Sequence, residues 1–142
     1  MSINNQLGLK FMAMQTRAEF QDLLVHLICS GAFTKKEMQA AFRESFEIAE
    51  QKNMNLILVS GFELYGEPPS VMERFEMGVY VAELCRHFGK PVSISFAAEI
   101  PIVDPKRFGE TVARNRGANG KVFTDLVEAK EWLSQFRLDQ NI

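Results

Sequence analysis

The chain has 142 residues, of which 46% are apolar and 24% are charged, a composition typical of one folded domain rather than a disordered segment. A chain of this length buries about 68–70% of its unfolded surface, enough for a core without disulfides or metal. Its net charge of −2 argues against general nucleic-acid binding. No apolar run approaches the roughly 20 residues that span a bilayer, and residues 1–6 lack the basic and apolar regions of a signal peptide. We therefore expect a single cytoplasmic domain over residues 1–142.

The two cysteines and the two histidines exclude several chemistries. Cys29 and Cys85 stand singly in apolar runs without C-x-x-C spacing, so we interpret both as buried free thiols. His26 lies inside an apolar run and is interpreted as a hydrogen-bonded or edge-facing strand histidine rather than a catalytic base. Neither His26 nor His87 has a metal-ligand partner at useful spacing. We predict no metal site and no cofactor.

The first third of the chain predicts a pair of strands and a helix. Residues 7–14 alternate between apolar and polar, as an edge strand does, and the apolar run 23–29 is typical of a strand covered on both faces. Thr34 and Glu37 form a capping box. Behind this box, apolar residues recur at helical spacing until about Asn53, a residue that tolerates the left-handed conformation of a helix end.

The remainder of the chain continues to alternate between strand and helix. Residues 55–61 predict a buried strand, and a loop over 62–69 leads to a helix over 70–87 with Val71 and Phe75 on its apolar arc. The other predicted elements, in chain order, are a strand over 92–96, a helix capped by Asp104 and ended by Gly117, a strand over 121–123, and a helix from Asp125 to about 136.

Alternation of strands and helices with short connections predicts parallel strands joined by right-handed crossovers. The N-terminal strand then adds antiparallel at an edge. We therefore expect an α/β fold, a mixed sheet of about five strands with four helices.

Segments 31–34 (GAFT), 56–59 (LILV), 113–117 (ARNRG), 121–125 (KVFTD) and 128–133 (EAKEWL) stand in a characteristic order and spacing. In this arrangement they resemble the SpoIIAA-like family of STAS-related domains, which also look like the minimal core of CRAL-TRIO lipid-binding domains. The resemblance extends over most of the chain, roughly from residue 7 to residue 136. It implies a βα superhelix with strands in sequential order and helices largely on one face, and it implies no catalytic activity.

The related bacterial anti-sigma-factor antagonists dock a protein partner and are phosphorylated on a serine at the start of the second helix. The resemblance places Ser70 at this position. A phosphate there would be favoured by the helix N-terminus. Ser70 is also the first residue of a capping box that ends at Glu73, and this interpretation needs nothing further. The chain lacks the Asp-Ser pair of the phosphorylated relatives.

Open α/β sheets bind ligands in the crevice beyond the carboxyl ends of their strands. In this chain we expect the crevice to collect Ser60, Glu63, Tyr65, Glu99 and Thr124, with Asp104 near them. Glu63 and Glu99 are candidates for a general acid and base. Because no histidine, glycine-rich phosphate loop or metal cluster stands beside them in the sequence, we interpret both as surface carboxylates. The chain is not predicted to be an enzyme.

Apolar side chains suggest a different kind of site. Twelve phenylalanines and seven methionines are many for this length, and Met72, Phe75 and Met77 share one predicted helix. Adaptable Met and Phe surfaces suit a lipid, another small apolar ligand or a protein partner, although core packing accounts for most of them. A carrier of such a ligand requires a pocket of at least about 300 Å³ lined by Met and Phe.

The leading hypothesis is a non-enzymatic STAS-like regulatory module that binds a protein partner or a second copy of itself. Met12 and Met14, in the expected edge strand, are candidates for a homodimer contact. The alternatives are a carrier or sensor of a lipid or other small apolar ligand, and an antagonist that phosphorylation of Ser70 controls. A basic helix with Arg114 and Arg116 is interpreted as a solvated face rather than as a contact with an anionic membrane.

Overall fold

Within residues 13–137, which the computed structural model describes, five strands form one mixed sheet in the order β1-β2-β3-β4-β5. The strands are β1 (Gln15–Gln21), β2 (Leu24–Ala32), β3 (Leu56–Tyr65), β4 (Ser93–Ala97) and β5 (Asn119–Phe123). The four helices of this part are α2 (Lys35–Gln51), α3 (Val71–His87), α4 (Phe108–Asn115) and α5 (Leu126–Ser134). β1 pairs antiparallel with β2 at one edge, and the other neighbours pair parallel. The predicted α/β fold is confirmed.

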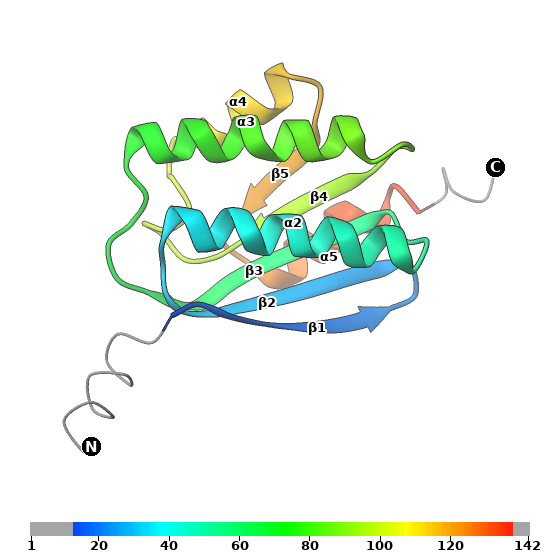
Figure 1. Cartoon of the computed structure of the whole chain (residues 1–142), viewed down its shortest axis with the longest axis horizontal. Helices are drawn as coiled ribbons and strands as arrows, with labels where there is room; N and C mark the ends of the chain where they lie inside the picture. Colours follow the sequence, from blue (N-terminus) through cyan, green and yellow to red (C-terminus); the bar gives the residue numbers. More distant parts are fainter. Residues whose placement is uncertain (1–12, 138–142) are drawn as a thin grey trace, which may run out of the picture.

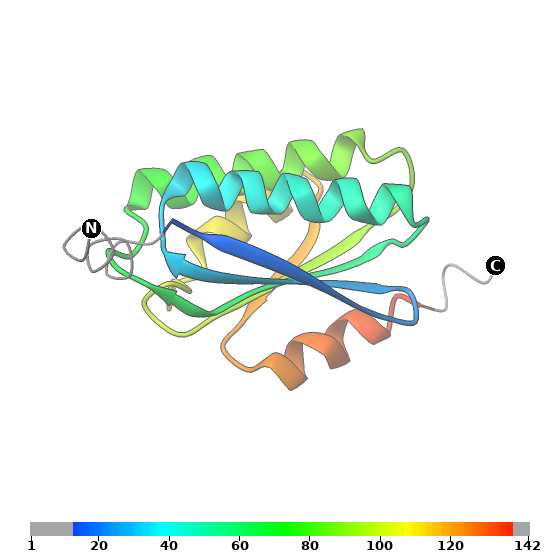
Figure 2. The same cartoon turned by 60° about the horizontal axis from the view of Figure 1, so that its bottom comes forward.

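The two faces of the sheet carry separate cores. Helices α2, α3 and α4 lie on one face, and α5 lies alone on the other (Figure 1, Figure 2). Because side chains alternate between the faces along a strand, Ile57 of β3 enters the main core beneath α2, whereas Leu58 enters the smaller core beneath α5. Each buried Leu or Ile contributes about 1.5–3 kcal/mol, so the sheet is stabilised from both sides.

Helix α2 forms as its sequence predicts. The Thr34 hydroxyl accepts the backbone N–H of Glu37 at 3.2 Å, and Asn53 beyond the end of the helix has a left-handed φ of 56°. One detail differs from a full capping box: the Glu37 carboxylate accepts the hydroxyl of Thr34. The predicted inner stripe is buried throughout, namely Met38, Ala41, Phe42, Ser45 and Ala49.

The edge strand of the described part occupies residues 15–21. The strand predicted over 7–14 lies mostly outside this part, as do all of residues 1–12, including Met12, and residues 13 and 14 are not in a strand. Met14 is half-buried and packs against the main core. Strand β3 continues to Tyr65, through residues predicted as a loop, because it keeps pairing with β2 beyond a register shift between Ile28 and Ser30.

Helix α4 begins at Phe108, later than the Asp104-Pro105 pair predicts. The Asp104 carboxylate instead accepts the backbone N–H groups of Lys106 and Phe108, each at 3.0 Å, and so stabilises a turn before the helix. Arg107 occupies the cap position with a left-handed φ of 54° and no side-chain hydrogen bond to the helix.

Helices α3 and α4 approach each other closely at a glycine. A Cβ atom on Gly78 would lie 2.6 Å from the carbonyl oxygen of Gly109 and 2.9 Å from the Cβ of Val112. The buried positions of α3 are accordingly small, namely Gly78, Val81 and Ala82. The apolar arc predicted for this helix is therefore wrong at its start, because Val71 is 72% exposed.

Candidate functional site

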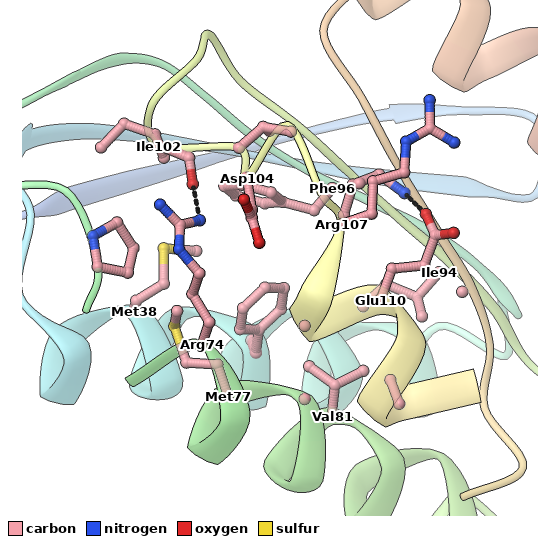
Figure 3. A pocket seen from close by; sticks show the side chains of 18 of the residues that line it. Met38, Arg74, Met77, Val81, Ile94, Phe96, Ile102, Asp104, Arg107 and Glu110 are labelled. Atoms are coloured by element: carbon pink, nitrogen blue, oxygen red, sulfur yellow. Dashed lines mark hydrogen bonds between the residues drawn. The ribbon is translucent and has the colours of Figure 1, made fainter. Parts of the chain in front are cut away.

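An apolar cavity of about 110 Å³ lies among α2, α3, α4 and the end of β4 (Figure 3). Its walls include Met38 and Phe42 of α2, Met77 and Val81 of α3, and Ile94 and Phe96 of β4. Figure 3 shows the Met38 and Met77 side chains on the same side of this space as Arg74. The cavity thus opens near the carboxyl ends of the parallel strands, the region where α/β sheets bind ligands.

Charged side chains stand around the apolar walls: Arg74, Asp104, Arg107, Glu110 and Lys121. The Arg74 guanidinium donates to the carbonyl oxygens of Ile102 at 3.0 Å and Pro101 at 2.7 Å, and so holds the β4–α4 loop against α3. The Glu110 carboxylate accepts the backbone N–H of Val122 at 2.8 Å and joins α4 to β5. These hydrogen bonds fix the frame of the cavity.

The electrostatics of the rim favour an ionised Asp104. Burial alone would raise the pKa of Asp104, but hydrogen bonds from the N–H groups of Lys106 and Phe108 and the nearby Arg74 charge outweigh burial and lower it. Arg74 and Asp104 therefore present opposite charges at the mouth of an otherwise apolar space. This arrangement suits an apolar group of a ligand or partner that is bordered by polar groups.

Reactive thiols do not contribute to the site. Burial raises the pKa of Cys29 to about 12, with a further contribution from Glu44, and burial raises the pKa of Cys85 to about 11. Both thiols are therefore protonated at neutral pH and are poor nucleophiles. In the described part of the chain, no group of three or more His, Cys, Asp or Glu side chains is placed to hold a metal ion.

The eight residues predicted for the crevice and the adjoining helix are not among those that line the cavity. Ser60 is buried on the α5 face, with its hydroxyl 2.8 Å from His26 Nε2. Glu63 is exposed and its carboxylate lies 3.5 Å from the guanidinium of Arg17 on β1. Tyr65 is 44% exposed at the end of β3. Ser60 shares the face of Leu56 and Leu58 by ordinary strand alternation, whereas Glu63 and Tyr65 follow the register shift between β2 and β3.

Ser70 caps α3 with both hydrogen bonds of the capping box. Its hydroxyl accepts the N–H of Glu73 at 3.1 Å, and the Glu73 carboxylate accepts the N–H of Ser70 at 2.9 Å. Glu99 and Thr124 are exposed beyond the ends of β4 and β5. The predicted crevice residues are therefore spread over several surfaces.

Two of the predicted residues do share a surface. Met72 is 64% exposed and Phe75 is 37% exposed on the first two turns of α3, beside Val71. We call Val71, Met72 and Phe75 the α3 patch. The Phe75 ring is partly covered by the Arg116 guanidinium, 5.3 Å from its centroid. A role for these residues in binding stays a prediction.

The residues that line the cavity carry a helical signal that the sequence analysis did not use. Arg74, Met77, Gly78 and Val81 recur at i, i+3, i+4 and i+7 and therefore lie on one face of α3. An arginine at the head of such a stripe indicates a polar boundary to an apolar surface. Met38, Phe42 and Phe96 fit the apolar patterns of their own helix and strand and carry no separate signal.

Two hollows in the described part of the chain do not match the pocket expected of a lipid carrier. The Met- and Phe-lined cavity, at about 110 Å³, is well below the roughly 300 Å³ that a drug-sized ligand needs. A second hollow of about 390 Å³ at the opposite end of the sheet combines polar and charged residues such as Asn55, Arg86 and Lys90 with apolar ones such as Val92 and Phe136, and no methionine lines it. No helix in the described residues is both long and apolar enough to cross a membrane.

No model of a protein family and no curated protein matches the sequence. Among solved structures, the chain is similar to the crystal structure of an anti-sigma factor antagonist from Mycobacterium paratuberculosis. The two share 12% sequence identity with a TM-score of 0.58, over 86% of this chain and 95% of that chain. At this identity the likeness is one of fold. The chain therefore has the fold of the SpoIIAA-like, STAS-related proteins that its sequence resembles.

Proposed function

We propose that this chain is a non-enzymatic STAS-like regulatory module that binds a protein partner through helix α3. The observation that carries the proposal is the α3 patch, in which Val71 is 72%, Met72 64% and Phe75 37% exposed. Large apolar side chains grouped on one element cost solvation free energy while they face water, and such groups mark protein interfaces.

The cavity beside α3 supports the same proposal. Interfaces concentrate their binding free energy where an apolar side chain of one partner fills a pocket of the other. A space of about 110 Å³ lined by Met38, Met77 and Phe96 suits one such side chain. The charged rim with Arg74 and Asp104 resembles the polar border that usually surrounds an apolar interface centre.

The fold suggests which proteins to test first. The solved structure similar to this chain is named as an anti-sigma factor antagonist, a class that acts by binding a protein. We therefore propose anti-sigma factors from the organism that makes this chain as the first candidate partners. Nothing in the cavity supports catalysis, because its walls are apolar and its carboxylates accept backbone N–H groups.

The test compares two helix N-termini that differ in the proposed role. The variant Val71→Glu/Met72→Glu places charge in the α3 patch. Val127→Glu is the matched control, since Val127 is 64% exposed, as Met72 is, and is likewise the second residue of its helix. Proteins recovered with the tagged chain from its host are identified by mass spectrometry, and their affinity for each purified variant is measured by calorimetry.

We expect the α3 variant to bind the recovered partner at least about tenfold more weakly, because apolar groups at an interface contribute about 1–2 kcal/mol or more each. The Val127→Glu control should bind the partner as the wild type does. Recovery of no protein, or equal binding by both variants, would contradict the proposal.

Ser70→Asp in the same assay tests the narrower proposal of a phosphorylation switch. A changed affinity supports the switch, whereas an unchanged affinity leaves Ser70 as a helix cap.

A further inference from the structure

Strand β1 is an edge strand, and within residues 13–137 no other strand pairs with its outer side. All seven of its residues are exposed, and they pair with β2 without a register shift, from Gln15 opposite Ser30 to Gln21 opposite Leu24. In an antiparallel strand, every second residue turns its N–H and C=O away from the neighbour. Proteins usually protect such an edge with proline, charged side chains, a bulge or a very short strand. β1 has no proline and no bulge, and its two charged residues, Arg17 and Glu19, are of opposite sign.

The sequence of β1 is complementary to itself. Consider two β1 strands paired antiparallel about a twofold axis that passes between their Ala18 residues. Arg17 of each copy then lies opposite Glu19 of the other copy, so two such pairs form. Thr16 faces Phe20 and Gln15 faces Gln21 of the second copy in the same way. Directly opposed residues share a face of the sheet, and opposite charges in such positions are stabilising.

The two charges also select this register. A twofold axis perpendicular to the sheet pairs residues of the same parity, so the neighbouring symmetric registers are centred on residue 17 or residue 19. In the register centred on residue 17, the two copies of Arg17 lie opposite each other, and in the register centred on residue 19, the two copies of Glu19 do. Like charges directly opposite each other are destabilising. The centre at Ala18 is therefore favoured over both.

The surroundings of β1 leave room for a second copy. Helix α2 packs on β2 and β3 and reaches β1 through the hydrogen bond from the Thr16 hydroxyl to Glu44. Helix α5 packs on β3, β4 and β5, and β1 remains exposed at the sheet edge (Figure 2). Phe20 is 46% exposed, although the Lys52 ammonium lies 4.9 Å from the centroid of its ring. Opposite Thr16 of a second copy, this ring would lose part of its exposure to water.

We propose that two copies of this chain associate through β1, antiparallel and centred on Ala18, to form one continuous ten-stranded sheet. A sheet of this size lies within the range of natural sheets. No residue of β1 lines the cavity, which lies among α2, α3, α4 and the end of β4, and the α3 patch is on a helix that packs mainly on α2 and α4, so neither is part of the proposed interface. The inference therefore stands independently of the proposed partner.

Charge reversal tests the interface on the full chain. The mass of the wild-type protein is measured by sedimentation over a wide range of concentrations, and we expect a dimer that dissociates on dilution. Arg17→Glu or Glu19→Arg alone should raise the dissociation constant at least about tenfold, because each creates two like-charge pairs. The double variant Arg17→Glu/Glu19→Arg restores both opposite-charge pairs and should restore the dimer.

The rescue separates the interface from a local effect, since Arg17 also lies 3.5 Å from Glu63 within its own chain. Arg86→Glu, a reversal at an exposed arginine on α3, is the control and should leave the dimer unchanged. A wild-type chain that is monomeric at every concentration overturns the proposal. So does a dimer that Arg17→Glu does not weaken, or single variants that the double variant fails to rescue.

Hydrogen exchange identifies the interface directly. If β1 pairs with a second copy, its outward-facing amides exchange more slowly as the concentration rises, while the exchange of β5, the other edge of the sheet, stays constant. A concentration-dependent dimer without added protection in β1 would overturn the proposed interface.

Discussion

His26, Ser60 and Ser95 are polar side chains buried on the sheet face that α5 shares. His26 Nε2 and the Ser60 hydroxyl are 2.8 Å apart, which confirms the interpretation of His26 as a hydrogen-bonded strand histidine. The hydroxyl of Ser95 has no hydrogen-bond partner within residues 13–137. Burial lowers the pKa of His26, the charges of Lys130 and Arg17 lower it further, and Glu19 opposes them. The neutral ring is therefore favoured in the folded state.

This lowered pKa predicts a loss of stability in mild acid. Because the folded-state pKa of His26 lies below its ordinary value of 6.5, the unfolded chain takes up a proton more readily. The contribution of His26 to the free energy of unfolding is complete above pH 6.5 and is lost as the pH falls from 6.5 through the folded-state pKa. Urea unfolding at pH 7.5 and 5.5 measures this loss.

The matched variants for this measurement are His26→Gln and His87→Gln. His26→Gln should be less stable overall but show a smaller decrease between the two pH values. His87→Gln, at an exposed position on α3, should retain the wild-type decrease. An equal decrease in His26→Gln and wild type would assign the pH dependence to other groups.

At the scale of elements, α3 is the helix whose environment differs most from what its sequence indicates. It packs mainly on α2 and α4 rather than on the strands. Its inner positions are therefore the small Gly78, Val81 and Ala82, whereas Val71 and Met72 remain in water. The contact with α4 depends on the missing side chain of Gly78.

We predict that Gly78→Ala destabilises the protein by about 1–3 kcal/mol, because the added methyl group overlaps the Gly109 carbonyl and Val112 and forces the helices apart. Alanine at an exposed helical position would instead gain about 0.5–1 kcal/mol over glycine. Glu83→Ala, at an exposed position of the same helix, should stay within about 0.5 kcal/mol of wild type. Urea unfolding measures both, and a stabilised Gly78→Ala would show that α4 can move without cost.

The sequence predicts elements better than it predicts side-chain directions. Local signals were sufficient for α2, where Thr34 and Asn53 mark the ends, and for the order of the strands. They were insufficient for α4, because the Asp104 carboxylate stabilises a turn as readily as a helix start. The cavity was expected at the carboxyl ends of the strands with Asp104 near it, and Asp104 does line it. Its other walls were not expected, because they form where α2, α3, α4 and β4 pack together, which no local pattern in the sequence indicates.

At the scale of the whole molecule, the strands belong to two cores at once, and this couples the opposite faces of the sheet. Neighbouring residues such as Ile57 and Leu58 serve different cores. Loss of either core therefore exposes one side of every central strand, which favours one cooperative unfolding transition over stepwise loss of α5.

Trp132, the single tryptophan of the sequence, reports on the smaller core. Its ring centroid lies 4.9 Å from that of Phe136 and 6.0 Å from that of Phe123. We predict that its fluorescence and the far-ultraviolet circular dichroism, to which the long helices α2 and α3 contribute most, change at the same urea concentration. Fluorescence that changes first would show that α5 detaches before the main core unfolds.

The agreement between strand order and chain order has a consequence for folding. Each parallel strand joins the strand that precedes it, so no segment has to insert between two strands that are already paired. Each pairing then closes only the segment between two consecutive strands, which limits the loop-closure entropy lost at each step. During synthesis, the unit from β2 to β3 can form while the C-terminal residues are still inside the ribosome, and each later strand extends an existing edge. The sheet can therefore grow in the direction of translation.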